Sequence, residues 1–186
     1  MVKQKSGLNK NGNKKGDVMG GRGGSSGLSG GGKEYSVDNI KKKLPDINDF
    51  KLDKPPKLEG SEKQVAWAKK IRADFVPSLV QSVFAWQQDF VKAMNSGGNE
   101  GVARYIYDRA VATHKNRYNY ISNKKEAKKL ANKDIADYVN RSISSYNTLK
   151  KQIQAVNKLA TNNSAKFWID NRNSYNEIRK KILEIK

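Results

Sequence analysis

Cationic side chains are densely interleaved with tyrosines in one part of the sequence, residues 104–133. Thirty residues hold nine lysines and arginines but only two acids, and the tyrosines among them are Tyr105, Tyr107, Tyr118 and Tyr120. Cations neutralise phosphates and release counterions, while aromatic rings stack on exposed bases. The pattern therefore predicts a surface that binds nucleic acid, either DNA or RNA, through Arg104, Arg109, Lys115, Arg117, Lys124, Lys125, Lys128, Lys129 and Lys133.

Four of these lysines have the spacing of a single helical face. Lys124, Lys125, Lys128 and Lys129 fall on one arc of a helix, where they can follow a run of phosphates. The competing interpretation is an ordinary charged helix surface, with the tyrosines at the edge of the core. The spacing alone leaves both interpretations open.

Groups suited to catalysis or metal binding are scarce. The chain has no cysteine and one histidine, His114, which excludes disulfides, cysteine-ligated metals and histidine clusters. The acids after residue 57 are dispersed; Asp134 and Asp137 stand three apart, a spacing typical of a solvated helix face. Residues 97–101 lack the lysine and the preceding strand of a phosphate-binding loop. We expect a non-enzymatic protein with no metal, no cofactor and no small-molecule substrate.

The overall charge of the chain also favours a polyanionic partner. The 186 residues carry a net charge of +19, and only 36% are hydrophobic, against about 45–50% in an average globular domain. Such a charge attracts polyanions. No stretch reaches the ~18 apolar residues of a membrane span, and residues 1–32 contain no apolar signal region. We therefore expect a cytoplasmic protein with no membrane partner.

Glycine and proline divide the chain into three parts. Eleven of the fifteen glycines lie in residues 1–32, which predicts a flexible, basic, glycine-rich tail over residues 1–34. Residues 35–57 form a linker or a packing arm, in which Ser36 or Asp38 caps a short helix that Pro45 stops. Residues 58–186 are long enough for a single α-helical domain.

Apolar residues recur at helical spacing throughout this domain, and strand-like alternation is missing, so the predicted fold is all-α. Ser61 and Gln64 form a capping box for the first helix, which Pro77 ends or kinks. A second apolar stripe runs from 79 to 94 and closes at 97–98, and a third helix starts near 99. Residues 123–162 form two helices with a break in the serine-rich stretch 141–147, and a last element begins at Ser164.

Two short blocks stand apart from the basic segment. The first, residues 60–72, reads Gly-Ser-Glu-Lys-Gln-Val-Ala-Trp-Ala-Lys-Lys-Ile-Arg, and the second, residues 165–172, reads Ala-Lys-Phe-Trp-Ile-Asp-Asn-Arg. Tryptophans 67, 86 and 168 lie on or near apolar stripes, which favours core positions for all three. Arg72 and Arg172 each follow an aromatic-rich helical turn, so either can stack on a tryptophan face or clamp an anion.

The pair of blocks resembles small, largely uncharacterised proteins of bacterial phages and other mobile elements, and this resemblance implies that the cytoplasm is that of a bacterial host cell. In those proteins a Gly-Ser-x-Lys-Gln-x-x-Trp-Ala-x-x-Ile-Arg block is paired with a C-terminal Trp-Ile-Asp-Asn-Arg block. The resemblance covers about 20 of the 186 residues and implies that the first and last helices pack together. It places Trp67, Ile71, Trp168 and Ile169 in contact and Arg72 in one polar site with Asp170 or Arg172; the motif residues are Gln64, Trp67, Arg72, Trp168, Asp170 and Arg172.

Three functions follow from these observations. The first is a basic nucleic-acid-binding protein of a phage or mobile element, acting on DNA, RNA or a nucleoprotein complex. The alternative is an anti-CRISPR-type inhibitor that binds an RNA-guided nuclease mainly through protein contacts, since such nucleases hold a nucleic-acid backbone in an accessible channel. The third is an enzyme that uses Asp170, Arg172 and Glu62.

Overall fold

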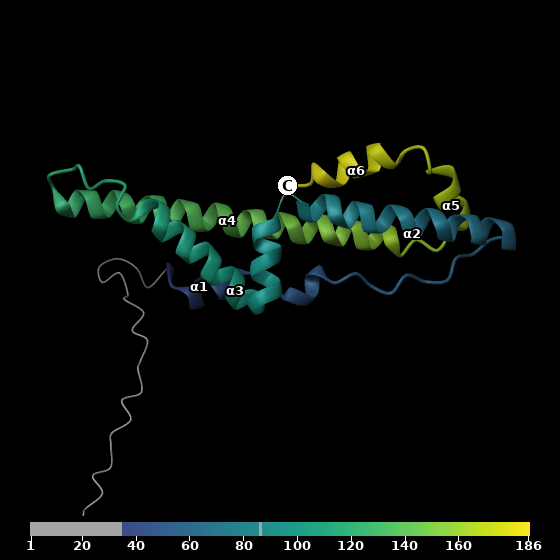
Figure 1. Cartoon of the computed structure of the whole chain (residues 1–186), viewed down its shortest axis with the longest axis horizontal. Helices are drawn as coiled ribbons and strands as arrows, with labels where there is room; N and C mark the ends of the chain where they lie inside the picture. Colours follow the sequence, from purple (N-terminus) through teal and green to yellow (C-terminus); the bar gives the residue numbers. More distant parts are fainter. Residues whose placement is uncertain (1–34, 86) are drawn as a thin grey trace, which may run out of the picture.

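The computed structural model describes residues 35–85 and 87–186; the predicted tail and the predicted core position of Trp86 lie outside the described residues. The elements are α1 (Val37–Lys43), the 3-10 helix η2 (Ile47–Phe50), α2 (Glu62–Ala85), α3 (Gln88–His114), α4 (Lys124–Ala160), α5 (Ala165–Asp170) and α6 (Tyr175–Leu183) (Figure 1). Apart from one isolated bridge between Glu59 and Ser164, the described part of the chain is helices and connections. The predicted all-α fold is confirmed.

Helix α4 is the longest element and runs through the molecule from end to end (Figure 1). Its 37 residues span about 55 Å. The predicted break at 141–147 is wrong, because the helix continues through this stretch. Ile143 and Tyr146 are buried and continue the apolar stripe from Val139 to Leu149. Burial of this stripe outweighs the weak helix propensity of the serines beside it.

The two helices before α4 have other boundaries than the sequence predicts. Helix α2 continues through Pro77 as far as Ala85, because Phe75, Leu79 and Val83 bury one continuous face on both sides of the proline. The predicted stripe 79–94 is therefore divided between α2 and α3. At Gly97 and Gly98 the backbone leaves helical geometry, with φ 55° and ψ −144° at Gly98, a conformation open to glycine alone. The predicted helix end at 97–98 and the predicted start near 99 are therefore confirmed, as the break between the two helical parts of α3.

Side-chain caps fix where the helices begin. The predicted capping box is confirmed: the Ser61 backbone N–H donates to Gln64 Oε1 at 3.1 Å, and the Gln64 N–H donates to Ser61 Oγ at 3.4 Å. Ser36 caps α1 and Ser164 caps α5 in the same manner. Asn123 caps α4 by accepting the N–H groups of the second and third residues of that helix.

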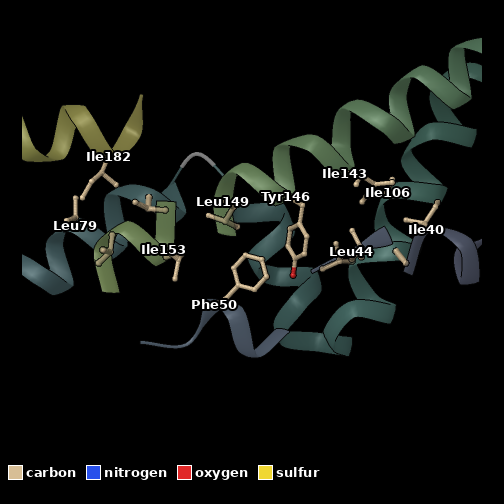
Figure 2. Packing of buried hydrophobic residues seen from close by; sticks show 14 of the residues in the cluster. Ile40, Leu44, Phe50, Leu79, Ile106, Ile143, Tyr146, Leu149, Ile153 and Ile182 are labelled. Carbon is tan, nitrogen blue, oxygen red and sulfur yellow. The ribbon is translucent and has the colours of Figure 1, made fainter. Parts of the chain in front are cut away.

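A single core joins the 35–57 segment to the helices (Figure 2). Ile40 and Leu44 lie near Ile106, and the Phe50 ring lies 4.7 Å from the Tyr146 ring, centroid to centroid. Residues 35–50 therefore pack on α3 and α4, whereas residues 51–57 are exposed. The Tyr146 hydroxyl has no hydrogen-bond partner among the described residues, and burial raises the pKa of Tyr146 to about 12.

The opposite part of the core lies where α5 and α6 fold back over α2 and α4 (Figure 1). Trp168 is fully buried, and its indole N–H donates to the Asn162 carbonyl at 3.0 Å. The rings of Phe75 and Tyr175 stack with centroids 3.9 Å apart. Gln152 on α4 donates to the Leu183 carbonyl at the end of α6. We call α5, α6 and the parts of α2 and α4 that they cover the bundle end.

Candidate nucleic-acid interface

The last turns of α3 and the first turns of α4 form a helical hairpin that extends away from the bundle end (Figure 1). We call residues 115–133 the hairpin tip. Seven of the nine predicted cations lie in this segment, and every one of them is exposed: Lys115, Arg117, Lys124, Lys125, Lys128, Lys129 and Lys133. Glu126 is the one acid within the hairpin tip. The structure therefore gathers most of the predicted basic surface at one end of the molecule.

Asp134 on α4 holds the connection between the two helices. Its Oδ2 accepts hydrogen bonds from the Tyr118 hydroxyl at 2.8 Å and from Arg117 Nη1 at 2.9 Å. The Tyr118 hydrogen bond is the main cause that lowers the pKa of Asp134, and the Arg117 charge adds to it. His114, the last residue of α3, is buried with Nδ1 at 3.7 Å from the same oxygen. Arg117 is thus partly committed to shaping the hairpin.

The tyrosines of the basic segment have different environments. Tyr120 is 79% exposed at the hairpin tip, and its ring centroid lies 6.3 Å from that of the partly buried Tyr118. Tyr105 is directed elsewhere: its hydroxyl donates to Asp89 at 2.9 Å, and its ring packs edge-on against Phe90. Tyr107 packs against the core. Of the four rings, that of Tyr120 is the one best placed for stacking on a ligand.

A cavity of about 260 Å³ opens between the connection and the first turns of α4. Its lining combines cations, amides, an aromatic ring and apolar side chains, and includes Lys115, Tyr118, Asn119, Ile121, Lys124 and Asn132. Amide groups pair with the edges of bases, and aromatic rings stack on their faces. The hairpin tip therefore offers a recess as well as an exposed charged surface.

The remaining two predicted cations lie outside the hairpin tip. Arg104 donates to Glu100 at 3.1 Å, and Glu100 also pairs with Lys41 on α1 at 3.3 Å. The hydrogen bond from Arg104, with that from Lys41, lowers the pKa of Glu100. Arg104 precedes Lys115 by eleven residues of helix, about 16 Å, and its ion pair lies within α3, whereas the Lys41–Glu100 pair joins α3 to α1. Arg109 is exposed between the two, and the neighbouring Tyr105 raises its pKa.

The two motif blocks meet at the bundle end, where α5 packs on α2. Trp168 lies in the core as predicted, but Trp67 does not: its side chain is 48% exposed. Trp67 precedes Ala68, which faces the core, and so lies on the outer side of α2. The guanidinium of Arg172 covers the Trp67 ring, with Cζ 5.3 Å from its centroid. The predicted stacking of Arg172 on a tryptophan is confirmed.

The residues of the predicted polar site, Arg72 with Asp170 or Arg172, have other partners in the structure. Arg72 donates instead to the Pro56 carbonyl at 3.1 Å, and burial lowers the pKa of Arg72. Asp170 is exposed and pairs with Lys166 at 2.8 Å, four residues earlier on the same helix. Asp170 is thus paired within its own helix, and Arg72 is bonded to the segment that precedes α2. Gln64 serves as the cap of α2.

Two features escaped the sequence analysis. The first is the hydrogen bond from the Tyr118 hydroxyl to Asp134, a residue sixteen positions later in the chain. No local pattern marks the turn that brings the two residues together. The second is Arg179 on α6, whose Nη2 donates to Ser78 Oγ on α2 at 3.1 Å. No local pattern marks this second contact, because it depends on the path of the chain between α5 and α6.

The comparisons with known proteins add no assignment. Among residues 35–85 and 87–186, no helix is long and apolar enough to cross a membrane. The same residues bring no three histidine, cysteine, aspartate or glutamate side chains close enough to hold a metal ion. No family model matches the chain, and no curated protein or solved structure matches it.

Proposed function

We propose that the hairpin tip binds nucleic acid without catalysing a reaction. In this proposal the lysines neutralise phosphates and the Tyr120 ring stacks on a base. The observation that carries it is the gathering of seven exposed cations around a tyrosine that is 79% exposed, at one end of the molecule. The cavity beside Tyr118 adds a recess of about 260 Å³ that can receive a base or sugar.

The position of the lysines on α4 supports a binding role. The first turns of a helix carry the positive end of its dipole, where cations are unfavourable and acids are favoured. Lys124 and Lys125 nevertheless occupy the first turn of α4, and Lys128 and Lys129 occupy the second, against the single acid Glu126. Residues that reduce the stability of their own helix are expected at positions where they are needed for function.

The geometry favours single-stranded over duplex ligands. Bases in a duplex are already stacked on one another, so an exposed ring such as Tyr120 contributes only to unpaired bases. Base–aromatic stacking contributes about 1–3 kcal/mol per base. We therefore expect Tyr120→Ala to weaken single-strand binding about 5- to 150-fold and to leave duplex binding nearly unchanged.

The test is a salt series of fluorescence-anisotropy titrations with single-stranded DNA, RNA and duplex DNA. The test variant replaces Lys124, Lys125, Lys128 and Lys129 with glutamine. Four fewer phosphate contacts reduce the slope of log K against log salt by up to about 3 for a single strand. The control variant makes the same change at four exposed lysines of the bundle end, Lys63, Lys69, Lys70 and Lys181, and keeps the same net charge.

Equal losses in the two variants would show that net charge alone attracts nucleic acid, which contradicts the proposal. Weak binding by the unaltered chain, together with a stable co-eluting complex with an RNA-guided nuclease, would favour the anti-CRISPR-type inhibitor instead. The resemblance to phage and mobile-element proteins is the reason to include that nuclease in the test.

A further inference from the structure

A second surface lies at the bundle end, away from the hairpin tip (Figure 1). An open groove of about 450 Å³ runs between α2 and the segment that leads from α5 into α6. Its lining includes Ile71, Asp74, Phe75, Ser78, Arg172 and Arg179. Phe75 on α2 and Tyr175 on α6 both line the groove, and their rings stack on each other. The proposed nucleic-acid interface uses none of these residues.

The charged groups of the groove are not neutralised within the described part of the chain. Arg172, Arg179 and Asp74 take part in none of its ion pairs. The Nε of Arg179 is buried and has no hydrogen-bond partner there, although Nη2 donates to Ser78. A buried N–H without an acceptor is destabilising, and more so when the group is charged. Two guanidinium groups, one with an unused buried donor, suit a ligand that brings carboxylates or phosphates.

An exposed tryptophan continues the groove on the same helix. Trp67 precedes Ile71 by four residues, so the two side chains are neighbours on α2. Trp67 is 48% exposed and lies under Arg172, which also lines the groove. Tryptophan, tyrosine and arginine are the residues that contribute most to protein–protein binding energy. The surface therefore combines an apolar anchor with anion-binding groups.

We propose that this surface docks an acidic peptide segment of a protein partner. The carboxylates of the segment pair with Arg172 and Arg179, and an apolar side chain packs against Trp67 and Ile71. Asp74 argues for a peptide over a nucleic-acid strand, because a carboxylate in the groove repels the closely spaced charges of a phosphate backbone. A peptide can place its acids beside the arginines and leave the position opposite Asp74 uncharged.

The experiment selects peptides from a random dodecapeptide display library on the immobilised full chain. A Trp67→Ala, Arg172→Gln double variant serves for counter-selection. We expect enriched peptides to contain several acids and a large apolar residue. Their affinity, measured by anisotropy, falls about tenfold or more with Trp67→Ala or Arg172→Gln. Both positions are exposed, and circular dichroism confirms that each variant is folded.

Matched controls separate this inference from the proposed function. Peptide affinity is unchanged in two controls: Lys181→Gln, at an exposed position on α6, and the four-lysine variant of the hairpin tip. Asp74→Asn raises the affinity for acidic peptides. Failure to enrich peptides, enrichment of peptides without acids, or equal affinity for the double variant overturns the proposal. Displacement of a selected peptide by inorganic phosphate or a single-stranded oligonucleotide at comparable concentration also overturns it, because the groove is then a general anion site. None of these outcomes depends on nucleic-acid binding at the hairpin tip.

Discussion

The two ends of α4 are supported in different ways. At the hairpin tip, α4 is covered by α3 and the 115–123 connection, and its one buried residue there is Ala131. At the bundle end, α2 and α6 both contact α4, and α5 packs on α2 and adds the buried Trp168 to the core. A thinly covered end can carry a dense surface charge, whereas a densely packed end can hold a groove in one shape. Each proposed site therefore matches the local packing.

The largest expected effect belongs to the bundle end. Trp168→Ala removes a fully buried indole and its hydrogen bond to Asn162, and we expect the free energy of unfolding to fall by about 3–5 kcal/mol. Urea denaturation measures this loss. Trp67→Ala is the matched control, because the exposed ring of Trp67 should change stability by less than about 0.5 kcal/mol. Similar losses for the two variants would contradict the assignment of Trp168 to the core and Trp67 to the surface.

An intermediate and local effect is expected at the hairpin tip. The lowered pKa of Asp134 means that its ionised form is favoured in the folded protein. The stabilisation of the folded state by ionised Asp134 is therefore fully present above the unfolded carboxyl pKa of about 3.9. It is lost as the pH falls through the lowered pKa of Asp134 in the folded protein. Amide hydrogen exchange should show residues 115–123 losing protection in this acidic range before the bundle end does.

Substitution offers the same test at neutral pH. Asp134→Ala should accelerate exchange in residues 115–123 and leave the amides of α2 and α5 unaffected, because the hydrogen bonds to Tyr118 and Arg117 are lost. Asp137→Ala, an exposed acid three residues later, is the control. Faster exchange throughout the molecule would show that the two ends do not open independently.

The smallest effect concerns the charges themselves. Lys125→Gln removes a cation from the first turn of α4 and should raise stability by about 0.3–1 kcal/mol at low salt. Lys158→Gln removes a cation from the last turn of the same helix and should lower stability by a similar amount. Thermal unfolding of the two variants shows the direction of each change in stability. A gain for both, or a loss for both, would contradict the dipole argument for the hairpin tip.

The sequence predicts this structure best where the interactions are local. The capping box of Ser61 and Gln64 and the all-α pattern are confirmed, since both depend on residues a few positions apart. The break predicted at 141–147 is wrong because its serines act locally, whereas Tyr146 is held in place by Phe50, far away in the chain.

The candidate sites show the same limit. The cations of the hairpin tip could be predicted because they are close together in the sequence. The exposure of Trp67 could not, because apolar spacing indicates one helix face and does not show which residues at its margin remain uncovered. The position of Arg179 beside Ser78 depends on the path of the chain after α5, which no local pattern fixes.

The uninterrupted length of α4 has a consequence for geometry. A continuous helix of 37 residues sets a fixed separation of about 55 Å between its two ends. This separation equals the length of roughly 16 base steps of DNA at 3.4 Å each. A partner held at the bundle end and a strand held at the hairpin tip would therefore be kept apart by a fixed distance. A flexible linker of equal length would leave that distance variable.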